Sequence, residues 1–349
     1  MRRKNDKITQ QDIADALGIS RNTVSKAING TGCISDKTKT MVLQKAKELS
    51  YQIDKVRVAP SKELEVKNIL LLAHQNSIKN PFWTRMASGI DRVTSRNGCN
   101  LVLNIVEAQE ERAESALEIF TRSQPAGVII QGPFSDVFMY ALHRTGVPMV
   151  AMDISPRFAF PNMICDVVMG HNAEAVEIIT SRLLDQGHSR IGFVGDIEYA
   201  LGYMERWEGF VRAHTNRGLK PDMRRCILRP QPEHYFNREE VSDALEKALR
   251  DTTAYVCVTD SIAIHLSRAL TDLGFNLPED VAVAGYDNMG RHIFPYYGLT
   301  TVNSYPEYVG EKLAELLFLR MENKKGCYCV LRVCTEPIFM ESTERCVLR

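Results

Sequence analysis

Side chains that can bind DNA gather in the first forty residues of the chain. Arg21 can donate two hydrogen bonds to guanine, and Asn22 can form two with adenine. Ser25 and Lys26 follow at helical spacing and would share their outward face, although any single cation here could instead be a solvated surface residue. The other polar groups suit phosphate contacts. The predicted DNA-binding residues are Thr9, Ser20, Arg21, Asn22, Thr23, Ser25, Lys26, Asn29 and Lys37.

Three short helices between residues 8 and 50 must position these groups. The segment Thr9-Gln10-Gln11-Asp12 has the form of a helix N-cap, and Ser20 can cap the next helix. Ala14, Gly18 and Val24 supply a small residue, a residue tolerant of positive φ and an apolar residue at the separations that a helix-turn-helix needs. Its second helix would present its N-terminal end to the major groove.

The charge distribution agrees with a polyanionic partner. Residues 1–62 hold 13 Lys and Arg against 6 Asp and Glu, whereas the remainder holds 30 against 37, so a net charge of zero hides a basic head on an acidic body. A basic head is typical of nucleic-acid binding, although charge alone fits a solvated basic terminus equally well.

Beyond residue 66 the pattern changes to short, β-branched runs separated by amphipathic helices. This alternation predicts parallel sheets covered on both faces. The runs form two sets of similar spacing, which predicts two similar lobes with a ligand between them, beyond the carboxyl ends of the strands. The predicted strands are Ile69–Ala73, Leu101–Ile105, Val128–Gln131, Pro148–Met152, Ile191–Gly195, Cys226–Arg229, Tyr255–Thr259 and Val281–Gly285.

The first fifty residues resemble the N-terminal domain of the lactose-repressor (LacI/GalR) family. Three segments carry the likeness: Gly18-Ile19-Ser20, Thr23-Val24-Ser25 and Asn29-Gly30. The resemblance implies that Arg21 and Asn22 occupy base-reading positions. Lys26 stands where the family more often has Arg, and Lys lacks the planar fork that binds guanine through two bonds.

The linker departs from the family pattern. The family places a short helix after the head, which inserts a Leu into the minor groove and kinks the DNA. Here Pro60 falls where that Leu is expected, and an interior Pro opposes a helix. The helix is therefore either absent, or shorter with Val56 or Val58 as its wedge. We expect weaker DNA bending than in the family.

The resemblance continues through the rest of the chain. The matching segments are Asn80-Pro81-Phe82, Gly187-His188, Arg206-Trp207-Glu208-Gly209-Phe210, Thr259-Asp260, Leu277-Pro278-Glu279-Asp280-Val281 and Gly285-Tyr286-Asp287. It implies a fold with an all-α helix-turn-helix head and an α/β, periplasmic-binding-protein-like clamshell of two parallel-sheet lobes. We expect a DNA-binding domain at 1–54, a linker at 55–65 and an effector-binding domain at 66–349. Lobe 1 would comprise 66–163 and 291–323, and lobe 2 would comprise 164–290 and 324–349.

Arg206 and Asp260 are the main candidates for holding the effector, because the resemblance places them at positions that commonly do so. Asp260 follows a strand, where its carboxylate can accept hydrogen bonds from ligand hydroxyl or ring N–H groups. The pair could instead be a structural ion pair, and Asp287 could be a cap. Aromatic side chains could stack on a sugar or base, or simply pack in a core. The predicted effector-binding residues are Phe82, Trp83, Arg206, Phe236, Asp260 and Asp287.

The chain lacks the motifs of the other function classes that we considered. It has no phosphate-binding Gly-rich loop, nucleophile elbow or paired His ligands, so we expect neither an enzyme nor a cofactor. Nine scattered cysteines indicate free thiols in a reducing compartment, and Cys327, Cys329 and Cys334 lack a fourth ligand for a metal. No apolar run reaches the length of a membrane span, and the charged N-terminal residues do not resemble a secretory signal, which predicts a cytoplasmic protein.

These observations predict a sequence-specific transcriptional regulator, a repressor, that binds a palindromic double-stranded operator as a homodimer and responds allosterically to a sugar, nucleoside or purine. The first-lobe helices near Met86, Ile90 and Val93 are candidates for the dimer face. Two alternatives remain open at this stage. One is a regulator with a degenerate cleft that a partner protein controls. The other is a transport-type ligand-binding protein, which would not need a basic head.

Overall fold

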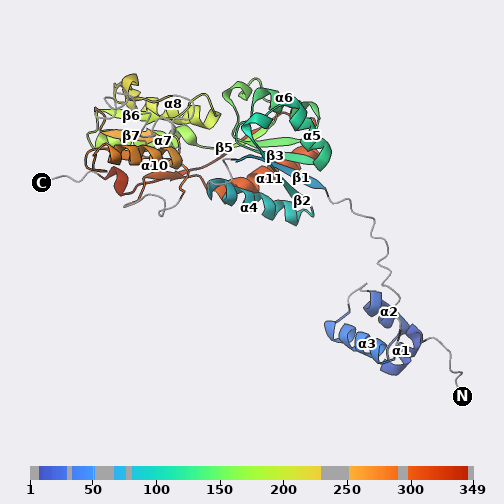
Figure 1. Cartoon of the computed structure of the whole chain (residues 1–349). Helices are drawn as coiled ribbons and strands as arrows, with labels where there is room; N and C mark the ends of the chain where they lie inside the picture. The colour runs from blue at the N-terminus through green and yellow to red at the C-terminus, as the bar shows by residue number, and fades with distance from the viewer. Residues whose placement is uncertain are drawn as a thin grey trace, which may run out of the picture. The chain divides into compact units, whose positions relative to one another are not determined.

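The computed structural model describes residues 8–29, 34–49, 51, 67–75, 81–228, 251–289 and 298–344. Internal contacts divide the chain into two compact units, Met1–Val66 and Lys67–Arg349 (Figure 1). The expected linker at 55–65, with Pro60, lies outside the described residues, as do Phe236 and the side chain of Asn29. Among the described residues, no helix is long and apolar enough to cross a membrane.

The described part of the first unit folds into three helices, α1 (Gln10–Leu17), α2 (Arg21–Asn29) and α3 (Asp36–Glu48). Thr9 begins α1 through a reciprocal cap, in which the Asp12 amide donates to Thr9 Oγ1 at 3.4 Å and the Thr9 amide donates to Asp12 Oδ2 at 2.8 Å. Gly18 ends α1 in the left-handed conformation with a φ of 64°, which lets the chain turn sharply into α2.

A small apolar core joins the three helices. Ala14 and Val24 are completely buried, as the predicted helix-turn-helix requires. The helix-turn-helix is therefore confirmed, and the opposite side of α2 faces solvent. The buried core residues are Ile13, Ala14, Val24, Ala27, Ile28, Val42 and Ala46.

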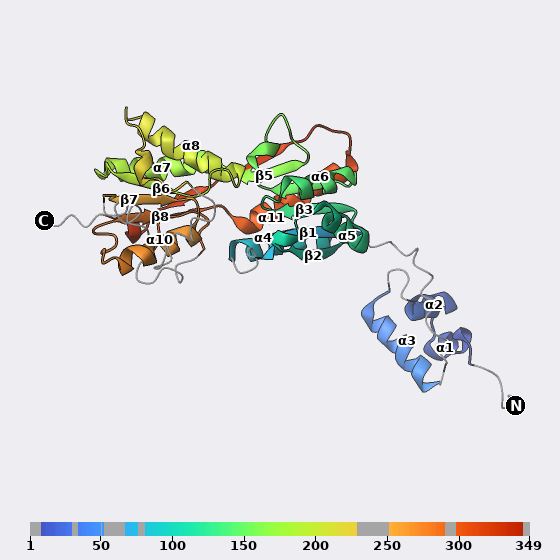
Figure 2. The same cartoon turned by 45° about the horizontal axis from the view of Figure 1, so that its top comes forward.

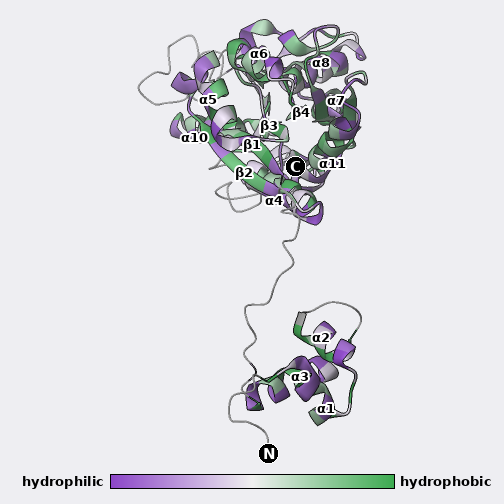
Figure 3. Cartoon of the chain, turned by 90° about the vertical axis from the view of Figure 1, so that its right-hand side faces the viewer, coloured by the Kyte–Doolittle hydropathy of each residue, from purple (hydrophilic) through white to green (hydrophobic). Residues whose placement is uncertain are grey.

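The first lobe of the second unit is built on a parallel six-stranded sheet in the order β10-β5-β4-β3-β1-β2. Alternate residues of β1 point to opposite faces. Leu70 and Leu72 pack with residues of α5 and α6, whereas Ile69 and Leu71 pack with residues of α4 and α11. The two pairs of helices lie on different sides of the sheet (Figure 3). The elements are β1 (Asn68–His74), α4 (Pro81–Arg96), β2 (Asn100–Val106), α5 (Ala113–Ser123), β3 (Gly127–Gln131), α6 (Asp136–Arg144), β4 (Met149–Met152), β5 (Asp166–Gly170), α11 (Pro306–Glu322) and β10 (Val330–Val333).

The second lobe holds the parallel sheet β6-β7-β8, with α7 and α8 on one face and α10 on the other (Figure 2). An isolated bridge joins Ala284 of β8 to Thr300, beside the antiparallel pair of β9 and β11. The elements are α7 (Asn172–Asp185), β6 (Ile191–Val194), α8 (Leu201–Thr215), β7 (Ala254–Cys257), α10 (Asp260–Asp272), β8 (Ala282–Ala284), β9 (Thr301–Asn303) and β11 (Glu336–Ile338). Short 3₁₀ turns lie at Ala108–Glu110, Pro156–Phe158, Met223–Arg225 and Glu341–Thr343.

The chain passes between the lobes at three places, and these differ from the expected boundaries. It crosses between β5 and α7, between β9 and α11, and between β10 and β11. The expected boundaries lay after residues 163, 290 and 323. Of the predicted strand Cys226–Arg229, the described residues 226–228 contribute an isolated bridge from Ile227 to Val194 and no strand.

The difference has a physical cause in two strands at the lobe junction. β5 begins with the completely buried Asp166, whose carboxylate accepts hydrogen bonds from Arg320 Nε at 2.6 Å and Nη2 at 2.7 Å. β10 is an edge strand that exposes Val330 and Arg332. Each strand therefore carries a charged residue, Asp166 at the start of β5 and Arg332 inside β10, which interrupts the apolar pattern typical of a buried parallel strand.

Candidate functional sites

The solvent-facing side of α2 carries the predicted base-reading residues. Arg21, Asn22 and Lys26 are exposed, and Thr23 and Ser25 are half-buried. The residues that hold α2 against the other helices lie on its opposite side, so substituting the exposed ones would not disturb the core. α2 thus presents a polar face that begins with a cation and an amide, the two groups best suited to paired hydrogen bonds with base edges.

Thr9 and Ser20 have a structural role whatever they contact in DNA. Ser20 Oγ accepts a hydrogen bond from the Thr23 amide at 3.1 Å and lies 2.8 Å from Thr23 Oγ1. Thr9 is bonded to Asp12 in the cap of α1. Lys37 is exposed in the first turn of α3. These groups lie beside helix N-termini, where phosphate oxygens bind favourably.

Arg206 is buried at the carboxyl ends of the second-lobe strands and is held on several sides. Its Nε donates to Asn172 Oδ1 at 3.2 Å, and its Nη1 donates to the Val258 carbonyl at 2.5 Å. The guanidinium carbon lies 3.6 Å from the ring centre of Tyr286. The Arg206 side chain is only 8% exposed, and its Nη2 lies 4.0 Å from Asp287 Oδ1, a separation longer than a charge-assisted hydrogen bond.

Asp260 and Asp287 lie next to Arg206 and are both buried. Thr301 Oγ1 donates to Asp260 Oδ1 at 2.6 Å, and the Met289 amide donates to Asp260 Oδ2 at 2.9 Å. Burial, reinforced by the charge of Asp287, raises the pKa of Asp260 to about 8. Burial also raises the pKa of Asp287 to about 7, against the opposing effect of Arg206. A carboxyl group of this kind can accept hydrogen bonds, and in its neutral form it can also donate one.

We define the Arg206 cluster as Asn172, Arg206, Asp260, Tyr286 and Asp287. The sequence favoured Asp260 over Asp287, but the carboxylate that lies 4.0 Å from the Arg206 guanidinium is that of Asp287. Sequence reasoning missed Asn172 and Tyr286. Asn172 begins α7 directly after β5, so recognising that strand would have identified it. Tyr286 follows β8 and is completely buried, which the sequence does not distinguish from ordinary core packing.

The three aromatic residues predicted to contact the effector differ in their surroundings. Phe82 is 5% exposed and packs in the core of the first lobe with Ile69 and Met86, which is the core-packing alternative. Trp83 is half-buried, and its ring lies close to Gly132, just past the end of β3. Phe236 is outside the described residues.

The three residues that marked the candidate dimer face lie inside the first lobe. Met86 and Ile90 are completely buried and Val93 is 6% exposed, because this side of α4 packs on the first-lobe sheet and on α11. Side chains that are buried within their own lobe cannot contact a second copy.

The described residues contain no group of three or more potential metal ligands, and Cys327, Cys329 and Cys334 are exposed free thiols.

Comparison with known protein families decides the classification. Residues 9–54 match the model described as bacterial regulatory proteins, lacI family, and residues 180–343 match a periplasmic binding protein-like domain. The chain belongs to the LacI family. The first match lies within the unit Met1–Val66, and the second lies within the unit Lys67–Arg349.

Named relatives of this LacI-family chain span nearly its whole length. The HTH-type transcriptional repressor PurR of Pasteurella multocida is 28% identical, covering 96% of this chain and 98% of the relative. The ribose operon repressor of Haemophilus influenzae is 25% identical, with coverages of 93% and 97%. These relatives are repressors rather than enzymes, and a LacI-family chain with this head is a DNA-binding transcriptional regulator.

Solved structures show the same fold. A complex of the transcriptional regulator CelR with cellobiose superposes with a TM-score of 0.68 at 23% identity, covering 96% of this chain and 99% of that chain. The Lac repressor dimer bound to operator and the anti-inducer ONPF gives a TM-score of 0.65 at 20% identity, with coverages of 97% and 99%.

Proposed function

We propose that this LacI-family protein is a repressor that binds a palindromic operator as a homodimer and changes its DNA affinity when a hydroxyl-bearing small molecule occupies the Arg206 cluster. The observation that carries the proposal is the combination of an exposed polar face on α2 with a buried cluster in which Arg206 Nη2 and Asp287 Oδ1 are 4.0 Å apart, longer than a hydrogen bond.

The head would read its operator through Arg21 and Asn22, the exposed groups that open α2. Lys26 would extend the contact as a point charge. The capped N-termini of α1, α2 and α3 would bind the phosphates through Thr9, Ser20, Thr23 and Lys37. Binding of a duplex to such a face takes place where chromosomal DNA is, which supports the expected cytoplasmic location.

The chemistry of the Arg206 cluster favours a sugar or a nucleoside as effector. Arg206 Nη2 offers a donor, and Asp260 and Asp287 can accept hydrogen bonds from vicinal hydroxyl groups. Trp83, half-buried beside the first-lobe sheet, offers a ring on which a sugar or base could stack. Related chains have been solved with cellobiose and with ribose, which supports a polyhydroxylated effector.

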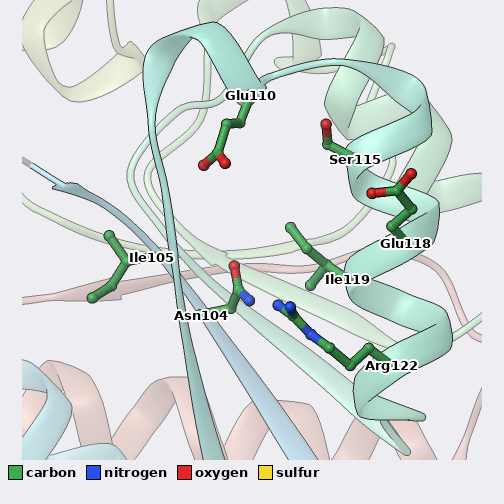
Figure 4. Close-up of a pocket in the computed structure, with 7 residues that line it drawn as sticks. All are labelled: Asn104, Ile105, Glu110, Ser115, Glu118, Ile119 and Arg122. Atoms are coloured by element: carbon green, nitrogen blue, oxygen red, sulfur yellow. The ribbon is translucent and has the colours of Figure 1, made fainter.

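The first-lobe surface at β2 and α5 is our proposed dimer face, in place of the buried residues of α4. Leu103 and Ile105 on the edge strand β2 are 53% and 43% exposed, and Leu117 on α5 is 48% exposed. A hollow of about 340 Å³ between β2 and α5 is lined in part by Ile105, and the Arg122 side chain is directed toward Asn104 there (Figure 4). A second copy would bury these apolar side chains and cover the edge of the sheet.

Selection of bound duplexes from a random pool tests the function directly. The full chain should enrich a palindrome at physiological salt, and one member of a panel of sugars, nucleosides and purines should change that affinity. An Asp260→Ala variant should still enrich the palindrome but lose the response. Enrichment of no sequence contradicts the regulator proposal. If calorimetry detects no binding of any panel member, control by a partner protein is favoured instead.

A further inference from the structure

The two lobes touch directly where the N-terminus of α8 meets the first lobe. The Leu201 amide donates to the Ile154 carbonyl at 2.7 Å. The Gly202 amide donates to Asp153, at 3.0 Å from Oδ1 and 3.1 Å from Oδ2. Amides in the first turn of a helix have no partner within the helix, so the first lobe supplies the partners that α8 itself lacks.

The fit at this contact is close. Gly202 carries no side chain, and a Cβ at this position would overlap Asp153 Oδ2. Asp153 holds its carboxylate there from a left-handed backbone conformation with a φ of 63°. The Leu201 side chain, although it belongs to α8, packs against the first-lobe core that includes Ile154 and Phe158. Polar and apolar contacts therefore join the lobes at the same point.

A second contact lies one turn further along the same helix. Arg332 of β10 donates from Nη2 to Glu205 Oε1 at 2.5 Å and from Nη1 to Oε2 at 3.0 Å. Glu205 also accepts a hydrogen bond from Asn172 Nδ2 at 3.0 Å. Asn172 in turn binds Arg206. The contact between the lobes is thus connected by hydrogen bonds to the Arg206 cluster.

We propose that these contacts form a latch that holds the two lobes together through residues of the chain itself. The α8 latch consists of Asp153, Ile154, Leu201, Gly202, Glu205 and Arg332. The latch would affect the proposed control by a small molecule, because an effector would act on two lobes that already contact each other. Its test, however, requires neither DNA nor an effector, so the two proposals can fail separately.

Hydrogen exchange of the full chain, followed by mass spectrometry on peptides that span Leu201 and Gly202, tests the latch. Because these two amides have no helical partners, their protection reports on contact with the first lobe. We expect slow exchange in the wild type and an increase of about ten- to a hundredfold in Asp153→Gly. Glycine accepts the left-handed backbone, so this variant removes the carboxylate without strain. Glu208→Ala, an exposed position on α8, is the matched control and should exchange as the wild type does.

Slow exchange in β1 peptides verifies that the variant remains folded. Where Asp153→Gly unfolds the whole lobe, Arg332→Gln provides the second test, with faster exchange expected at Leu201 and Gly202 while β1 stays protected. The latch is wrong if these amides already exchange rapidly in the wild type. It is equally wrong if a folded variant lacking the Asp153 carboxylate, or the Arg332 guanidinium, protects them as well as the wild type does.

Discussion

The guanidinium of Arg206 lies over the ring of Tyr286, with 3.6 Å between the guanidinium carbon and the ring centre. Together with the bonds to Asn172 and to the Val258 carbonyl, this contact fixes the plane of the guanidinium before any ligand arrives. A preorganised donor loses less conformational entropy on binding than a mobile one. Arg206 therefore combines a structural role with the role we propose in effector binding.

Replacing Arg206 with Lys should destabilise the second unit by about 3 kcal/mol, because Asp287 and the Val258 carbonyl would remain buried without the fork that serves them. Urea denaturation of the full chain measures this loss. Arg212, also on α8, forms a more exposed ion pair with Glu177 of α7, and Arg212→Lys should change stability by less than about 1 kcal/mol. Equal effects of the two substitutions would show that burial of Arg206 has no energetic importance.

The stability of the second unit should fall as the pH rises from about 4 to about 8. The pKa values of Asp260 and Asp287 are raised to about 8 and about 7, chiefly by burial. Unfolded Asp has a pKa near 3.9, so the folded chain holds more protons than the unfolded chain over this interval. The stabilisation present at low pH is therefore lost as the pH rises through the folded values.

The Asp287→Asn variant tests this explanation, since it removes one titrating group and the charge that raises the pKa of Asp260. The decrease in Tm between pH 5 and pH 8 should be smaller than in the wild type. Asp272→Asn, an exposed position on α10, is the control and should retain the wild-type decrease. A decrease that is unchanged in Asp287→Asn would place its origin elsewhere in the chain.

Replacing Arg21 with Ala should cost about 1–3 kcal/mol of operator affinity and relax the preference at one base position. Replacing Lys37 with Ala should instead weaken binding to all duplexes similarly and reduce the salt dependence by about one counterion. Fluorescence anisotropy with the selected palindrome and with random DNA distinguishes the two behaviours. A uniform loss for Arg21→Ala would identify that residue as a phosphate contact.

Gly18→Ala should destabilise the head by about 1 kcal/mol or more, because a Cβ is unfavourable at a φ of 64°. Nothing lies within 4 Å of the position where that Cβ would be, so backbone strain is the only expected cause. Gly18→Asn should lose less stability, since Asn tolerates the left-handed conformation. Helix content measured by circular dichroism during urea unfolding would show the order, and equal losses for both variants would contradict it.

Leu103→Glu should dissociate the proposed dimer, because it places a charge on the exposed apolar edge strand. Operator affinity should then fall by at least about a hundredfold, since the second head would no longer bind intramolecularly. Leu319→Glu, at a 61% exposed position on α11, provides a control away from the proposed face. Sedimentation velocity measures the oligomeric state of both variants. A Leu103→Glu variant that remains dimeric would show that the interface lies elsewhere.

The success of the sequence predictions depended on whether a feature is local. Gly18, Thr9 and Ser20 act through their own neighbourhoods, and the structure has them in the expected caps and turn. The junction strands could not be recognised locally, because the charge of Asp166 is neutralised by Arg320, more than a hundred residues away in the sequence. The inward orientation of Met86 depends similarly on α11, which packs against α4 only in the folded lobe.

The threefold passage of the chain between the lobes also constrains the order of folding during synthesis. The first-lobe sheet receives its last strand, β10, and one of its covering helices, α11, only after the residues of β6, β7 and β8 have been made. An emerging chain would therefore expose the apolar underside of β1, β3 and β4 until translation is nearly finished. Truncation before residue 306 should yield an aggregating fragment rather than an isolated lobe, and chaperones would have their main opportunity to bind in this interval.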